Sequence, residues 1–163
     1  MSELTDDLWS YTLHLYGKPG VPSACLALQD VHGIDVPLLI FATWLARRGA
    51  ALTTERAAIA RDGVTPWHVE IVRGLRQVRQ RMKHGPSPAP SADTETLRDA
   101  VKKVELASEK LELDTLAVIS QDWARGDLQP VLPNLVVMFT AMTGKVTDDP
   151  ALSLLAGQAE LTL

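Results

Sequence analysis

The chain of 163 residues contains a single cysteine, Cys25. One thiol can form neither an internal disulfide nor a multi-cysteine metal site, which fits a reducing compartment. No apolar run approaches the roughly 20 residues that a helix needs to cross a bilayer. The first residues, MSELTDDLW, are acidic and lack the basic start and apolar core of a signal peptide. We therefore expect a soluble, cytoplasmic protein without a membrane span.

Motifs for catalysis and cofactor binding are also missing. The chain has no P-loop, no nucleophile elbow and no glycine-rich dinucleotide fingerprint. Cys25 and His32 would lie roughly 10 Å apart along a helix axis. Zinc needs donor atoms at about 2.0–2.3 Å, so this pair alone cannot chelate the ion, and His14 or His68 could complete a site only through the tertiary fold. We therefore expect no metal site, no cofactor and no catalytic residue set, and we favour a protein that is not an enzyme.

The composition is that of an ordinary globular domain. Hydrophobic residues make up 46% of the chain and charged residues 22%, close to the average for soluble domains. Residues 1–90 carry ten Lys/Arg and eight Asp/Glu, whereas residues 91–163 carry six and twelve. We predict a single helical domain over 1–163. In it, a Pro/Ser-rich loop at 84–92 separates a slightly basic N-terminal half from an acidic C-terminal half.

Apolar residues recur at helical spacings, and no stretch shows a sustained period of two, so the sequence predicts an all-α fold. The stretch 36–46 has no charge and one hydroxyl, as expected of a segment buried on most sides. Asp35 is a good N-cap for it, Pro37 fits its first turn and Gly49 lies just past its end. We predict a helical bundle of about six or seven helices around this central apolar helix and a second apolar helix, 135–142.

A polar cluster around the start of the central helix is the main candidate for chemistry. It comprises Gln29, Asp30, His32 and Asp35, with Trp44 further along. Asp30 and Asp35 flank a glycine turn and could form a carboxylate pair in which one pKa is raised for acid–base work. In the structural alternative, Asp35 caps the helix and Asp30 bonds the backbone of the turn. An enzyme or small-molecule binder that uses Asp30, His32 and Asp35 is therefore a second functional hypothesis.

The predicted helix 66–83 is basic and is a candidate surface for an anionic partner. It could bind phosphates or anionic lipid. It could also pair with the glutamate-rich part of the predicted helix 93–125 in the same chain. The sequence leaves both alternatives open. The basic side chains are Arg73, Arg76, Arg79, Arg81 and Lys83.

Residues 54–83 superficially follow a helix-turn-helix, with a short helix, a turn at Gly63 and a second, basic helix. Two positions depart from that motif. Ile59 stands where the touching helices need a small residue, and Asp62 stands where the motif needs an apolar or small one. Because the net charge is also negative, at −4, nucleic-acid binding is only a third hypothesis, and nucleic acid is not the partner that we expect.

A heptad-like seam runs over residues 97–122 in alternating steps of four and three, weakened by polar residues at three positions. Such a seam can join two copies of the chain, so it offers a route to a homo-oligomer. Its residues are Leu97, Val101, Val104, Ser108, Leu111, Thr115, Val118 and Asp122. The seam, the opposed basic and acidic helices and the missing catalytic motifs favour a non-catalytic protein-interaction or regulatory protein with an unknown protein partner.

An ordered set of residues in the N-terminal half follows the pattern LQD-x-x-G-x-DV-x-LL-x-F-x-x-WL. This pattern resembles an uncharacterised bacterial family of small helical proteins, a domain of unknown function. Where that family has Asn after the Asp-Val pair, this chain has Pro37, so no polar role is expected there. The resemblance implies a bacterial, cytoplasmic helical protein and supplies no activity. Further residues that carry it are Leu8-Trp9, Tyr16, Pro19-Gly20-Val21 and Cys25-Leu26, and more loosely Trp67, Val72, Leu75-Arg76, Arg79, Glu105-Leu106 and Glu109.

Overall fold

The computed structural model describes residues 3–162, and their regular secondary structure is entirely helical. Because α4, η1 and α5 follow one another directly, these residues form seven helical segments. The predictions of an all-α fold and of about six or seven helices are confirmed. None of the described helices combines the length and the apolar character needed to cross a membrane. The elements are α1 (Glu3–Tyr16), α2 (Val21–His32), α3 (Val36–Arg47), α4 (Thr54–Trp67), the π-helix η1 (His68–Val72), α5 (Arg73–Arg81), α6 (Ala92–Ile119), α7 (Val131–Thr143) and α8 (Pro150–Glu160).

The chain divides into two compact units. Unit 1 comprises Met1–Gly63 and Leu113–Leu163, and unit 2 comprises Val64–Glu112. Unit 2 carries nine Lys/Arg and seven Asp/Glu, whereas the remainder of the chain carries seven and thirteen. The positive charge is therefore concentrated in unit 2. The description of the whole chain as a single domain stays a prediction.

Unit 1 is built around α3, the predicted central apolar helix. α3 packs against α1, α2, α7 and α8, and every residue of the range 36–46 is buried. Asp35 caps this helix, because its Oδ1 accepts a hydrogen bond from the backbone N–H of Leu38 at 3.3 Å. The second apolar helix, α7, adds Leu135 and Phe139 to the same core. The central position of the apolar helix is confirmed.

Asn134, near the start of α7, fastens that helix to α3 and to the chain that follows it. Its Oδ1 accepts a hydrogen bond from the backbone N–H of Leu52 at 3.0 Å. Its Nδ2 donates to the carbonyls of Ala42 and Ala50 at 3.2 and 3.1 Å. The side chain is buried, so these three bonds replace the water that the amide loses on folding.

Gly49 lies just past the end of α3, where the sequence predicts a stop. Its φ of +76° is in the left-handed region, and a Cβ at this position would overlap the carbonyl of Gly126. The backbone N–H of Gly126 donates to the carbonyl of Gly49 at 2.9 Å. Glycine is therefore required here both for the backbone conformation and for the close approach of a second segment.

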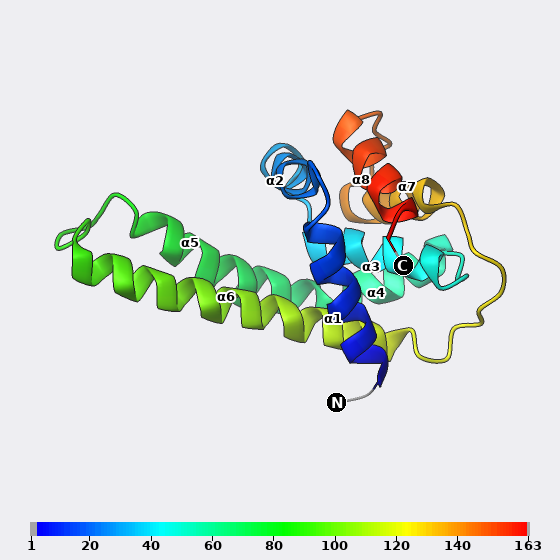
Figure 1. Cartoon of the computed structure of the whole chain (residues 1–163), viewed down its shortest axis with the longest axis horizontal. Helices are drawn as coiled ribbons and strands as arrows, with labels where there is room; N and C mark the ends of the chain where they lie inside the picture. Colours follow the sequence, from blue (N-terminus) through cyan, green and yellow to red (C-terminus); the bar gives the residue numbers. More distant parts are fainter. Residues whose placement is uncertain (1–2, 163) are drawn as a thin grey trace. The chain divides into compact units, whose positions relative to one another are not determined.

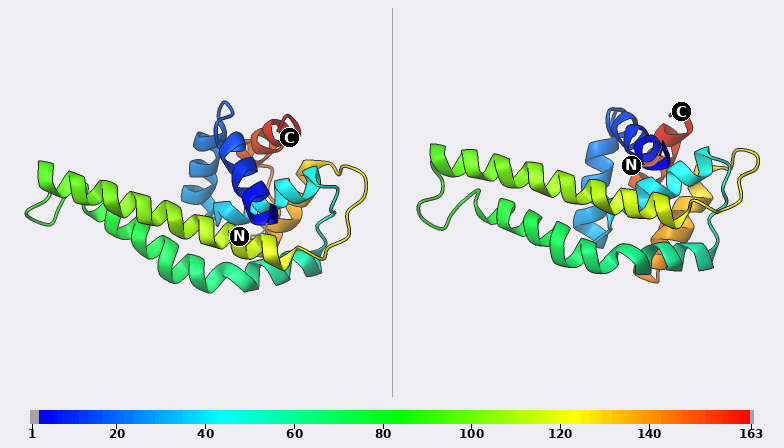
Figure 2. Two further views of the ribbon diagram at one scale, coloured as in Figure 1. Left: turned by 60° about the horizontal axis from the view of Figure 1, so that its bottom comes forward. Right: turned by 90° about the horizontal axis from the view of Figure 1, so that it is seen from below.

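Unit 2 is a helical hairpin, in which α5 and α6 run side by side (Figures 1 and 2). They are joined by a loop at 82–91. This loop contains most of the Pro/Ser-rich segment predicted at 84–92, and it lies inside unit 2. We refer to residues 64–112 as the hairpin.

The helix-turn-helix prediction for 54–83 is wrong, because residues 63–65, the expected turn, lie inside α4. Gly63 serves packing, since a Cβ there would lie 2.6 Å from Cδ1 of Ile119. Pro66 lacks the N–H that would bond the carbonyl one turn earlier. The helix nevertheless passes through Pro66 and continues as the π-helix η1, so the second helix does not begin at this proline.

Candidate functional site

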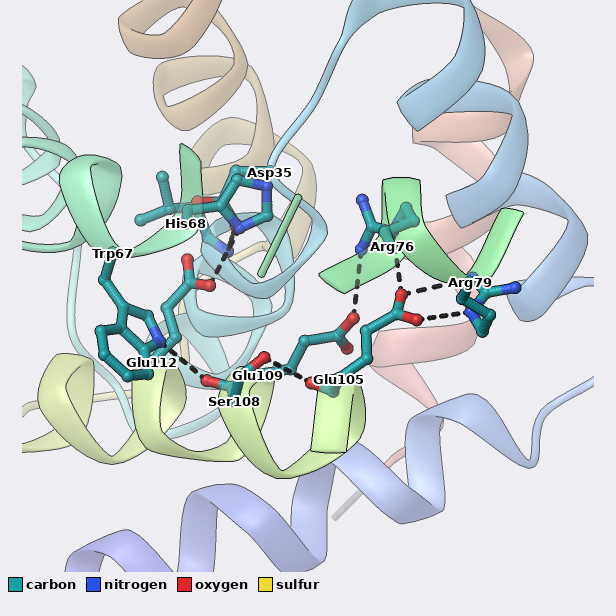
Figure 3. Close-up of polar contacts among 10 residues, drawn as sticks. Asp35, Trp67, His68, Arg76, Arg79, Glu105, Ser108, Glu109 and Glu112 are labelled. Carbon is teal, nitrogen blue, oxygen red and sulfur yellow. Dashed lines mark hydrogen bonds and ion pairs between the residues drawn. The ribbon is translucent and has the colours of Figure 1, made fainter. Parts of the chain in front are cut away.

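The polar interior of the hairpin is the main candidate site (Figure 3). Arg76 and Arg79 point from α5 toward α6, and Glu105 and Glu109 point back toward them. Nε of Arg76 donates to Glu105, and its Nη2 donates to Glu109, both at 3.1 Å. Arg79 donates to both carboxylate oxygens of Glu105. The four side chains therefore form one network, in which Glu105 accepts from two guanidinium groups.

Helical spacing explains how these groups meet. Arg76 and Arg79 are three residues apart and Glu105 and Glu109 are four apart, so each pair lies on one face of its helix. Two of the five predicted basic residues are thus paired within the chain. The remaining three, Arg73, Arg81 and Lys83, are exposed on the same helix and the turn after it.

The two glutamates of the network differ in their affinity for a proton. Burial disfavours the charged form of Glu105, but hydrogen bonds from Arg79 and Arg76 outweigh it and hold its pKa below the ordinary value. At Glu109 burial dominates, and the charge of Glu105 adds to it, so the pKa is raised despite Arg76. Glu105 is therefore the fixed anion of the network, and Glu109 takes up a proton first as the pH falls.

Two more side chains connect the first turns of the hairpin to α6. Nδ1 of His68 lies 2.9 Å from Oε2 of Glu112, and both side chains are buried. The indole Nε1 of Trp67 donates to the carbonyl of Ser108 at 2.9 Å (Figure 3). His68 also opens η1, where its carbonyl accepts from the N–H of Arg73, five residues on. Single π-turns are often found at functional positions, and this one coincides with a buried histidine.

Chemically, this interior is suited to holding two helices together. Hydrogen bonds between ionised partners are stronger than those between neutral groups. His68 and Glu112 offer a ring nitrogen and a carboxylate oxygen, both of which can bind metals. The contacts within the hairpin therefore support a structural role for the network.

The apolar side chains of α6 lie largely outside this interior. Leu97, Val104 and Leu111, which are seven residues apart, are 57%, 55% and 54% exposed. We call these three residues the apolar row. Ser108, from the same predicted seam, is instead buried. The hairpin thus has charged groups between its helices and an exposed row of apolar groups along α6, the reverse of the usual amphipathic arrangement.

Three residues of the predicted polar cluster take separate positions in unit 1. Asp35 is buried and caps α3. Asp30 is exposed near the end of α2, and Gln29 is half-buried one residue earlier. Asp30 and Asp35 therefore differ in exposure, and the acid–base pairing of the two stays a prediction.

The other two members, His32 and Trp44, bond to carboxylates from distant parts of unit 1. Nε2 of His32 lies 2.9 Å from Oδ2 of Asp149. Nε1 of Trp44 donates to Oδ2 of Asp7 at 2.8 Å, and the guanidinium of Arg48 lies over the Trp44 ring. Both aromatic rings are therefore tied to partners that the cluster hypothesis did not include.

Comparison with known proteins identifies the family. Residues 7–116 match a family described as "Protein of unknown function (DUF2390)", and this match spans more than half of the chain. The chain belongs to this family. The predicted resemblance to a family of unknown function is thereby confirmed, whereas the bacterial origin and the N-terminal pattern stay predictions. No curated protein and no solved structure matches the sequence significantly.

The DUF2390 match includes the hairpin network and His32 but ends before Asp149.

Sequence reasoning missed Asp149 as a partner of His32. An Asp-Pro pair is a recognisable helix start, and Oδ1 of Asp149 indeed accepts from the N–H of Ala151 at 2.9 Å. No local signal indicates that its other oxygen bonds a histidine 117 residues away in the sequence.

Proposed function

We propose that this DUF2390 protein is a non-catalytic interaction and regulatory protein of the bacterial cytoplasm, and that its hairpin docks on a helix of a separate protein. The observation that carries the proposal is the exposed apolar row. The charged interior already holds α5 to α6 at Arg76, Arg79, Glu105 and Glu109. The row is therefore available for contacts beyond the hairpin.

The chemistry around the row favours an amphipathic partner helix with acidic flanks. Side chains that repeat every seven residues fit a helix packed lengthwise along α6. Lys102 and Lys103 beside Val104 are exposed, as are Arg81 and Lys83 on the α5 side. Five exposed basic side chains stand against four exposed acidic ones in the hairpin, so its exposed charge is slightly positive, and two of the basic ones directly precede Val104. An acidic partner would gain complementarity and a faster approach.

The size of the row suits a reversible complex. Full burial of one exposed Leu or Val side chain stabilises by about 1.5–3 kcal/mol, and the row residues are already about half covered. The three together would supply on the order of 3 kcal/mol, far less than nanomolar binding needs. From the row alone we therefore expect a dissociation constant of about a millimolar or weaker, as suits a transient regulatory contact.

The test places a photo-crosslinking amino acid at Val104, in the row, or at Gln77, an exposed control position on α5. Proteins crosslinked in the native cytoplasm are identified, and the candidate is purified. Its affinity for the full chain is then compared with its affinity for the Val104→Asp and Gln77→Ala variants. We expect crosslinking from position 104, about tenfold or more weaker binding by Val104→Asp, and unchanged binding by Gln77→Ala.

Three outcomes would contradict the proposal: equal crosslinking from both positions, wild-type affinity of Val104→Asp, or no crosslinked protein at all. Crosslinking of the chain only to a second copy would replace it with the homo-oligomer predicted from the seam. Because Val104 is exposed, the Asp variant should fold, and circular dichroism of each variant checks this.

A further inference from the structure

A pocket of about 310 Å³ opens in unit 1 beside the end of α2, the end of α7 and the loop that follows α7. This volume is at the lower end of the range for small-molecule sites. Its apolar wall is formed by Val31, Phe139, Met142 and Val146. Val31 and Val146 are 70% and 79% exposed, so the rim presents apolar surface to the solvent.

His32 forms one polar part of the wall, and its ring is held from two sides. The ring meets Phe139 edge to face, with centroids 5.1 Å apart. Its Nε2 lies 2.9 Å from Oδ2 of Asp149. Hydrogen bonds from the N–H of Ala151 and from His32 hold the pKa of Asp149 below its ordinary value. Both oxygens of this carboxylate therefore already accept hydrogen bonds or contacts from within the chain.

Lys145 and Thr147 supply donors to the same pocket. Lys145 is exposed, and its ammonium makes no ion pair with any residue in the described part of the chain. The hydroxyl of Thr147 accepts from the N–H of Asp149 at 3.1 Å, which leaves its O–H as a donor. Lys145 therefore brings a positive charge to the lining of the pocket, and none of the lining side chains is a carboxylate.

We infer that this pocket binds a small organic anion, a carboxylate or phosphate group carried on an apolar body. Lys145 and Thr147 contact the charged group, and the apolar wall and the edge of the His32 ring contact the body. Such a ligand would cover the exposed side chains of Val31 and Val146 and would also neutralise the charge of the Lys145 ammonium. The site lies wholly within unit 1, so it is independent of the hairpin function proposed above.

The experiment is an NMR titration of the isotope-labelled full chain with benzoate, phenyl phosphate and uncharged benzyl alcohol. We expect saturable shifts at amides 31–33 and 139–147 with an anionic probe, and about tenfold or more weaker binding of benzyl alcohol. Lys145→Gln should weaken the anion about tenfold. Lys83→Gln, an exposed lysine of the hairpin, is the control and should bind like the wild type.

Tighter benzoate or tighter phenyl phosphate distinguishes a carboxylate from a phosphate site, and either result supports the inference. The inference fails if neither probe gives saturable shifts by about 10 mM. It also fails if benzyl alcohol binds as tightly as the anions, or if Lys145→Gln binds like the wild type. If acetate or inorganic phosphate bound as tightly as benzoate or phenyl phosphate, the apolar wall would not contribute to binding, and the inference of an apolar ligand body would fail.

Discussion

Arg76 donates a hydrogen bond to Glu105 at 3.1 Å, and the two side chains are only 12% and 7% exposed. A residue of the predicted anionic-partner surface is therefore already used inside the chain. Removing one member of such a buried pair leaves the other charge without a partner. This destabilises the fold by more than the intact pair stabilises it relative to apolar side chains of similar volume. The hairpin should therefore be sensitive to single changes in this network and tolerant of changes along its exposed apolar row.

Replacing Glu105 with Gln should lower the free energy of unfolding by about 2 kcal/mol at pH 7, because two guanidinium groups lose their shared counter-charge. Glu109→Gln is the matched control, on the same helix and bonded to the same Arg76. Since burial already disfavours the charge of Glu109, its replacement should cost little or nothing. Urea unfolding followed by circular dichroism measures both, and equal losses would contradict the assigned roles.

The two glutamates should also differ in the direction of their pH dependence. The pKa of Glu105 is lower in the folded state. The ionised Glu105 therefore contributes its full share to the free energy of unfolding above the unfolded pKa of about 4.3. This share disappears as the pH falls through the folded pKa. The pKa of Glu109 is raised, so stability is lost as the pH rises through that value. The deficit of Glu105→Gln should shrink below about pH 4, and a constant deficit would exclude this linkage.

The apolar row predicts a difference between two leucines of α6. Leu97 is 57% exposed and Leu113 is 2% exposed. Leu97→Ala should change the free energy of unfolding by less than about 0.5 kcal/mol. Leu113→Ala should cost about 3 kcal/mol, because it leaves a cavity in the core of unit 1. A large loss from Leu97→Ala in a monomeric sample would mean that the row already supports the fold.

Local signals predicted the helices well wherever a cap, a first-turn proline and a terminal glycine agree. At α3, Asp35, Pro37 and Gly49 all point to the same helix, and the structure has it. At Pro66 the local rule gave the wrong result, since a proline that fits a first turn also fits a continuous helix relaxed by a π-turn. Here a packing glycine, Gly63, is what the sequence rule took for a turn.

The contacts of the candidate sites depend on how distant segments of the chain fold back onto one another. The spacing of residues in the sequence alone does not reveal this. The sequence placed arginines and glutamates on two helices, and either exposure or pairing satisfied the pattern. Arg76 meets Glu105 because the loop at 82–91 folds α6 back along α5. The same closure takes Ser108 out of the predicted seam, since its carbonyl accepts from Trp67 of the hairpin's first turn. Val104, on a different face of α6, stays exposed.

Cys25 should be unreactive in the native chain. It is 2% exposed, and burial raises the pKa of its thiol to about 11. At pH 8 the reactive thiolate is then at least about a hundredfold scarcer than for an exposed cysteine. Reaction with a disulfide reagent such as DTNB should be correspondingly slower than in urea-unfolded chain. Equal rates under native and unfolding conditions would contradict the burial of this residue.

Asn134 should be the most sensitive polar residue of unit 1, although nothing in its local sequence distinguishes it. Asn134→Asp keeps the acceptor for the N–H of Leu52 but turns a carboxylate oxygen toward the carbonyls of Ala42 and Ala50. We expect a loss of about 3 kcal/mol or more at pH 7.

Gln129→Ala is the control for the Asn134 change, because Gln129 is also an amide that bonds a backbone carbonyl but does so in an exposed turn. Its removal should cost less than about 0.5 kcal/mol. Because the aspartic acid can protonate, the deficit of Asn134→Asp should narrow as the pH is lowered. A small deficit that is independent of pH would mean that the amide donors contribute nothing to holding α7 against α3.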